Sequence, residues 1–202
     1  WCQCDSCLAM DHADPGIGVA TRVLAFNNRV AAEVQKSHPD RLLTYYADYF
    51  QVNMTGPPVL GNGTVVLKAH PQVVPVIVNR FCYLHAIDDP DCPLNTNYRW
   101  RLRAWSQVAK RLMSYEYYTH LFDLPRTPTP QTWLIGGRIR HYKAMNFISY
   151  KVGALNRWPD NELACYLAGR LAWDASQDDR ALIEEFFRLY FQEAGNPMRA
   201  YY

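Results

Sequence analysis

The sequence predicts an α/β fold, the C-terminal half of a TIM-type (β/α)8 barrel with extra C-terminal helices, in a single domain over residues 1–202. Segments with the hydrophobic period of a helix alternate with short apolar or aromatic segments, a pattern typical of a parallel sheet covered by helices. Four segments predict strands, whereas a complete barrel has eight strands and takes about 250 residues. Half a barrel, without its N-terminal strands, therefore fits this sequence better than a whole one.

The first half of the chain predicts one helix and two strands. Apolar residues recur every three or four positions over residues 17–36, which predicts an amphipathic helix that ends before His38-Pro39. Residues 41–49 (RLLTYYADY) are rich in aromatic side chains and predict a strand, and a loop rich in Gly, Pro and Asn follows. The almost continuous apolar run over residues 73–81 indicates a strand that is buried on both faces.

The second half of the chain continues the alternation. A pair of adjacent glycines, Gly136 and Gly137, weakens one of its helical patterns without removing it. Asp178 stands where the last helix begins and is expected to be its N-cap. We expect helices over residues 98–112, 131–143, 161–173 and 179–191, and strands over residues 114–119 and 147–152.

Charge and hydropathy exclude two classes of partner. The net charge is +2, from 21 Lys+Arg and 19 Asp+Glu in no long like-charged run, so we expect no nucleic-acid partner. No window approaches about 18 consecutive apolar residues, so we expect no membrane span. The chain begins at Trp1 without Met and shows no signal peptide. We therefore expect a fragment whose partner is the missing N-terminal half of the same protein.

The six cysteines fall into two clusters and one single residue. Cys2, Cys4 and Cys7 stand at the start, and Cys82 and Cys92 follow the second predicted strand. Cys165 lies within a helical pattern, and we interpret it as a core residue. Two loops that meet would bring Cys4, Cys7, Cys82 and Cys92 together as four ligands of a structural zinc ion. Two disulfides in an oxidising compartment, or free thiols, explain the same residues. We expect no cofactor, with structural zinc as the alternative.

Candidate site residues follow from the strand order, because ligands of parallel α/β sheets lie at the carboxyl ends of the strands. Aromatic residues make up 14% of the chain, including 14 Tyr and 6 Trp, and flat-ligand or sugar clefts use such rings, although a Tyr-rich core explains them as well. The catalytic candidates are Glu116 and Asp48. The substrate-binding candidates are Tyr49, Arg80, His85, Tyr117, Tyr118, Lys151 and Trp158.

Each main candidate has a structural alternative. The aromatic neighbours of Glu116 would raise its pKa toward use as a general acid, but Glu116 could instead pair with Arg111 or Arg140. For Asp48, a hydrogen bond to a sugar hydroxyl is favoured over a catalytic role. His85 could bind a ligand or a metal, or pack under a loop with its nitrogens bonded to backbone.

Four blocks of the sequence resemble a bacterial family. They are the opening WCQCDSCLAMD, the strand and loop RFCYLHAIDDPDC, the join around Trp105 and SYEYY, and the closing LAWDASQDDRALIEEFFRLYFQEAG. In that order they resemble the domain of unknown function 4838 family over almost the whole chain. Where many members carry an acidic or amide residue after the last strand, this chain has Lys151.

The resemblance implies a glycoside-hydrolase-like TIM-barrel domain in a larger, secreted, periplasmic or cell-surface bacterial protein. Part of the family is similar to the glycoside hydrolase family 163 endo-β-N-acetylglucosaminidases. The expected function is therefore binding, and in the full-length protein hydrolysis, of an N-acetylhexosamine-containing glycan by acid catalysis. The alternatives are a non-catalytic carbohydrate-binding module and a structural scaffold with a zinc or disulfide clasp.

Overall fold

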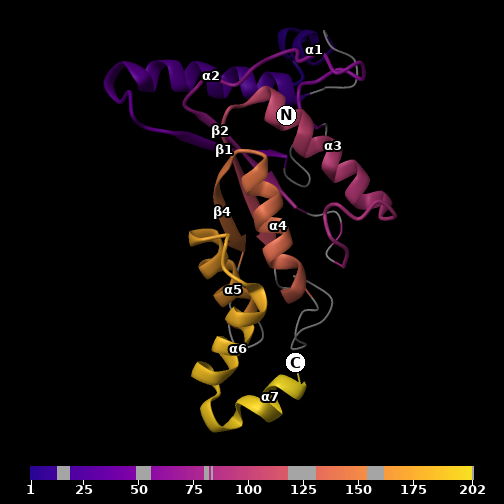
Figure 1. The fold of residues 1–202 in the computed structure, drawn as a ribbon. Helices are drawn as coiled ribbons and strands as arrows, with labels where there is room; N and C mark the ends of the chain where they lie inside the picture. The colour runs from indigo at the N-terminus through magenta and orange to yellow at the C-terminus, as the bar shows by residue number, and fades with distance from the viewer. Residues whose placement is uncertain are drawn as a thin grey trace.

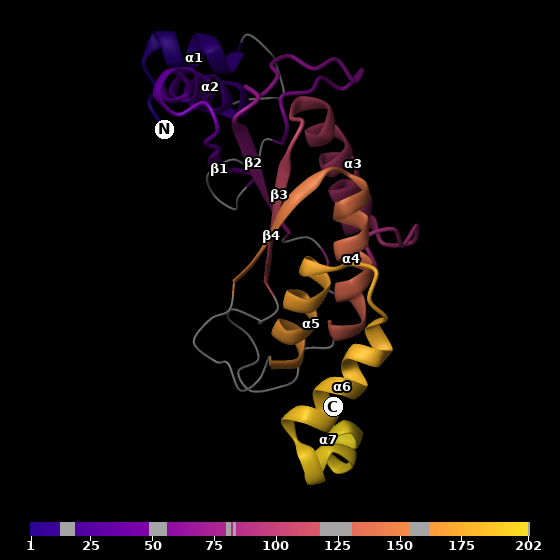
Figure 2. The ribbon, with the colours of Figure 1, turned by 60° about the vertical axis from the view of Figure 1, so that its left-hand side comes forward.

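The computed structural model describes residues 1–12, 19–48, 56–79, 82, 84–117, 131–153 and 162–201. The molecule is elongated, with helices α1 (Asp5–His12) and α2 (Val19–Ser37) at one end and the C-terminal helices at the other (Figures 1 and 2). The sheet lies between these ends. Within the described ranges, no helix combines the length and the apolar character that crossing a bilayer would require.

Four parallel strands form one sheet in the order β1-β2-β3-β4. They are β1 (Leu43–Asp48), β2 (Val73–Val78), β3 (Leu112–Tyr117) and β4 (Phe147–Gly153). Helices separate the later strands and extend beyond the last one. They are α3 (Pro93–Val108), α4 (Thr132–Ala144), α5 (Glu162–Trp173), α6 (Asp179–Tyr190), the 3-10 helix η2 (Gln192–Ala194) and α7 (Gly195–Tyr201).

The predicted α/β class and parallel sheet are confirmed. Sequential order and parallel pairing are compatible with half of a barrel. Every predicted strand and helix is present, and where both ends can be compared they differ from the prediction by up to five residues. Residues 17, 18, 49, 80, 81, 118, 119 and 161 of the predicted segments lie outside the described residues. Helices α1 and α7 were missed. The first has no apolar stripe, and the second (GNPMRAY) contains Gly, Asn and Pro, which are poor helix formers.

The first hydrophobic core lies between the sheet and α3. All six residues of β2 are buried, as the apolar run predicts. Ile77 of β2 and Leu112 of β3 are fully buried in one cluster with Trp105 of α3. Figure 2 shows α3 and α4 along the same face of the sheet. Because side chains alternate along a strand, the residues next to Ile77 and Leu112 face the opposite side, which we call the open face.

A second core lies between α4, α5 and α6. Ile135 of α4, Leu167 and Leu171 of α5 and Phe186 of α6 are buried in it. Asp178 caps α6 as predicted, since its carboxylate accepts a hydrogen bond of 2.8 Å from the Ala181 N–H. The C-terminal helices therefore have a core of their own, which contacts the sheet directly through Tyr150 and Val152 of β4.

The two glycines of α4 have different surroundings, and this difference gives a matched test. A Cβ added at Gly136 would overlap the carboxylate of Asp179, which pairs with Arg140, whereas a Cβ at Gly137 would meet nothing within 4 Å. Gly136→Ala gains the same helix propensity as Gly137→Ala but forces the Asp179 carboxylate to move from its pair with Arg140, so we expect it to be less stable than Gly137→Ala by about 0.5–1 kcal/mol. Gly137→Ala should stabilise the protein by roughly 0.5–1 kcal/mol, because Ala favours a helix.

Chemical denaturation of the two variants measures both effects in the intact protein. Equal effects of the two substitutions would contradict the close approach of α6 to α4 at Gly136.

Candidate functional site

An aromatic and cationic cluster occupies the open face near the carboxyl ends of the strands. The Lys151 Nζ of β4 donates a 2.8 Å hydrogen bond to the Tyr46 hydroxyl of β1. The same Nζ lies 4.8 Å from the ring centre of Tyr115 on β3 and 5.4 Å from that of Tyr46. Tyr117 joins the cluster, its ring 4.8 Å from that of Tyr115. We call Tyr46, Tyr115, Tyr117 and Lys151 the tyrosine–lysine cluster.

The geometry of this cluster indicates a concave face. Strands β1 and β4 are three positions apart in the sheet, which is about 14 Å on a flat sheet, yet their side chains form a hydrogen bond. The bond to Tyr46 raises the pKa of Lys151, so the amine keeps its positive charge. A Cβ at Gly153 would lie 2.9 Å from both the Tyr115 hydroxyl and the Tyr117 ring, so glycine at that position leaves room for the two rings.

Glu116 lies on the other face of the sheet, against the helices. Its side chain has no exposed surface. One carboxylate oxygen accepts a hydrogen bond from the Tyr142 hydroxyl of α4, and the other accepts one of 3.1 Å from the Asn79 amide. Arg138 of α4 is 3.6 Å away. Burial raises the pKa of Glu116, and Arg138 and the two hydrogen bonds oppose this shift only in part.

The partner of Glu116 differs from the two arginines named in the sequence-based alternative. Arg140 pairs with Asp179 of α6 instead, and Arg138 pairs with Glu116. Arg138 and Arg140 are two positions apart on one helix, so their side chains point in different directions. Arg138, Asn79 and Tyr142 all contact Glu116, and the sequence analysis did not identify any of them.

The remaining candidates fall into three groups. Asp48 is the last residue of β1, and the structure describes its backbone but not its side chain. Four further candidates lie outside the described residues: Tyr49, Arg80, Tyr118 and Trp158. Tyr117 and Lys151 come together in the tyrosine–lysine cluster. His85 lies beside Cys82, with the His85 Nδ1 3.2 Å from the Cys82 Sγ. Tyr46 was missed. The register pairs Tyr46 with Val76 and Val76 with Met113, which puts Tyr46 on one face with Tyr115, and the sequence alone does not give this register.

The four cysteines expected to share one zinc ion lie in two separate groups. Cys4 and Cys7 converge with Cys2, whereas Cys82 and Cys92 converge with His85. The first group precedes and begins α1, and the second lies between β2 and α3, so the two loops do not meet as that expectation requires. All six cysteines are described, and none forms a disulfide in this structure.

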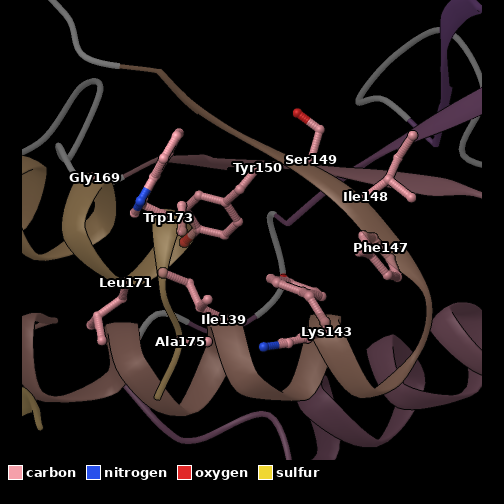
Figure 3. A pocket seen from close by; sticks show the side chains of 12 residues that line it. Ile139, Lys143, Phe147, Ile148, Ser149, Tyr150, Gly169, Leu171, Trp173 and Ala175 are labelled. Atoms are coloured by element: carbon pink, nitrogen blue, oxygen red, sulfur yellow. The ribbon is translucent and has the colours of Figure 1, made fainter. Parts of the chain in front are cut away.

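A hollow of about 440 Å³ opens between α4, β4 and α5. Figure 3 shows Tyr150, Ile139 and Lys143 directed into it, while Ser149 points away on the other side of β4. Its strand residues are Phe147–Tyr150, the amino-terminal half of β4. Ligands of parallel sheets bind at the opposite end, so the tyrosine–lysine cluster is the better candidate site.

Comparison with known proteins gives the family. A model described as Domain of unknown function (DUF4838) matches residues 1–202. The chain belongs to this family. No curated protein and no solved structure matches the chain. The resemblance stated from the sequence is therefore confirmed for the domain of unknown function 4838 family, whose description carries no activity.

The buried contacts of Glu116 predict a large effect on stability. Glu116→Ala would leave the Arg138 charge buried without its carboxylate, and we expect a loss of about 3–5 kcal/mol in the free energy of unfolding. Glu33→Ala is the matched control, because Glu33 pairs with Lys36 on the surface with 72% of its side chain exposed. We expect the control to change stability by less than about 0.5 kcal/mol.

Denaturant unfolding of both variants of the intact protein provides the measurement. A loss for Glu116→Ala as small as that for Glu33→Ala would mean that the buried ion pair is not formed in solution.

Proposed function

We propose that this chain forms the C-terminal half of a glycosidase-like (β/α)8 barrel that binds and hydrolyses an N-acetylhexosamine-containing glycan outside the cytoplasm. The sequential parallel sheet with interleaved helices supports the barrel part of this proposal. In such a barrel the open face would line the interior, and the site would form at the carboxyl ends of the strands.

The tyrosine–lysine cluster is the observation that carries the proposal. Tyrosine rings combine a flat apolar surface with a hydroxyl, which suits the C–H faces and hydroxyls of a sugar ring. Tyr46 is 42% exposed, so its ring can accept a ligand from solvent. Lys151 adds a charged donor beside the rings. These groups come from three strands, so a sugar placed here would contact much of the sheet.

Hydrolysis requires carboxyl groups in addition to this surface. A glycosidase commonly uses two of them, or one acid together with the N-acetyl group of the substrate. Glu116 has the raised pKa that suits a general acid, but its carboxylate is buried on the helix side of the sheet. Its catalytic role and that of Asp48 stay predictions.

The second candidate function is a non-catalytic carbohydrate-binding module. The buried network around Glu116 favours it, because this network accounts for the best carboxylate without any substrate. Lys151 favours it as well, since it stands where an acidic or amide residue was expected and engages two tyrosine rings. In this alternative the tyrosine–lysine cluster binds glycan and no carboxylate acts on the glycosidic bond.

Substitutions in the cluster test glycan binding. We expect Tyr46→Ala and Lys151→Ala in the intact protein each to weaken binding of an N-acetylglucosamine oligosaccharide by roughly three- to tenfold, the loss typical of one aromatic contact. Trp173→Ala is the control, because Trp173 is 93% exposed at the end of α5, outside the cluster. Calorimetric titration measures all three. Unchanged affinity in both cluster variants would remove this surface from the site.

Mass spectrometry of an N-glycan treated with the intact protein tests hydrolysis. We expect release of a glycan cut within its N-acetylglucosamine core. Binding without release would establish the carbohydrate-binding module instead. Glu116→Gln then decides the part of that carboxyl group, since loss of a general acid lowers turnover by about 100-fold or more while binding is kept. Unchanged turnover together with lower stability would assign Glu116 to packing alone.

A further inference from the structure

Two thiols and one imidazole converge between β2 and α3. The ligand atoms of Cys82, His85 and Cys92 all lie within 4.8 Å of one another. The Cys82 Sγ is 3.2 Å from the Nδ1 of His85. Cys82 and Cys92 are buried, with 8% and 4% of their surface exposed, and His85 is exposed. The three ligand atoms are therefore grouped near the surface, with the two thiols buried in the protein and the imidazole exposed to solvent.

The backbone of this cluster is held from three directions. Arg138 of α4 donates a 3.2 Å hydrogen bond to the Cys82 carbonyl. The fully buried Asn95 of α3 donates through its amide to the carbonyls of His85 at 3.2 Å and Ala86 at 2.7 Å. Cys92 is the N-cap of α3. Ordering the three ligands thus costs less than in a free loop, because the fold already fixes their backbone.

Cys92 stands at the amino end of a helix of 16 residues. Its side chain makes no cap hydrogen bond to that helix. The sulfur therefore keeps its lone pairs available for another group.

We propose that Cys82, His85 and Cys92 bind one Zn²⁺ ion, through two thiolate sulfurs and Nδ1, with water as the fourth ligand on the exposed side. Zinc in proteins is tetrahedral and takes these donors at about 2.3 Å for sulfur and 2.0–2.1 Å for nitrogen. Those bond lengths place the two sulfurs about 3.8 Å apart and each sulfur about 3.5 Å from the nitrogen. The three ligand atoms lie within 4.8 Å of one another, so small side-chain movements bring them to these distances.

The charges of the site balance. Two thiolates cancel the charge of Zn²⁺, and neutral imidazole adds none, so the ion is held without a buried net charge. The ion would join the end of β2 to the start of α3.

The other cysteine group is less suited to a cation. The guanidinium of Arg22, which pairs with Asp11, interacts with the Cys7 thiol, so this sulfur already has a partner. Cys2 and Cys4 are also exposed. The group Cys2, Cys4 and Cys7 therefore serves as the matched control for the zinc proposal.

The metal content of the intact protein tests the proposal. Protein equilibrated with zinc under reducing conditions and then gel-filtered is analysed for zinc per chain, with a chromophoric chelator as competitor. We expect the Cys82→Ser/Cys92→Ser variant to lose one zinc ion relative to the parent, and the Cys2→Ser/Cys4→Ser/Cys7→Ser variant to keep that ion. His85→Gln, at an exposed position, should weaken zinc binding by at least about tenfold.

Two measurements on the unmodified protein do not depend on the folding of a variant. Cobalt in place of zinc should show the visible absorption of a tetrahedral site and thiolate charge-transfer bands. Chelation should speed alkylation of Cys82 and Cys92. The proposal is overturned if neither Cys82→Ser/Cys92→Ser nor His85→Gln lowers the zinc content. It is also overturned if the purified protein carries a Cys82–Cys92 disulfide, which mass spectrometry detects as the loss of two hydrogens. Neither result depends on glycan binding.

Discussion

The buried carboxyl group of Glu116 is the interaction on which the arrangement of the sheet and helices depends. A carboxylate without exposed surface is costly unless several donors reach it. Here the donors are Asn79, which directly follows β2, and two residues of α4. Tyr142 extends the connection to α3, since its hydroxyl lies 2.7 Å from that of Tyr98. One group thus sets the positions of two strands and two helices together, because moving any of them leaves a buried polar atom without its partner.

Arg138 carries this network toward the loop after β2. Its guanidinium lies beside Glu116 and bonds to the carbonyl of Cys82, and it is among the largest fully buried side chains. The loop that holds the proposed zinc ligands is therefore attached to the same polar core that orders the sheet. This connection explains how three donors of different residues stay close together without a disulfide among them.

The two faces of the sheet have different tasks. The helix face holds the apolar core and the Glu116 network, which give stability. The open face has side chains that interact across three strands and remain in part accessible, as the 42% exposure of Tyr46 shows. A surface with this geometry is useful when something else contacts it, either the rest of a barrel or a ligand.

Local patterns in the sequence determined the order and type of most elements. The helical period of residues 17–36 and the apolar run of residues 73–81 led to α2 and β2 because these patterns reflect burial on one face or on both. The N-cap at Asp178 followed in the same way, from a residue type with a local partner. Only the tertiary structure decided which distant side chains meet. Lys151 and Tyr46 are 105 positions apart, and Glu116 is bonded to Arg138 rather than Arg140. The register shifts in the sheet and the rotation of α4 set these pairs, and neither is encoded in a repeating pattern of the chain.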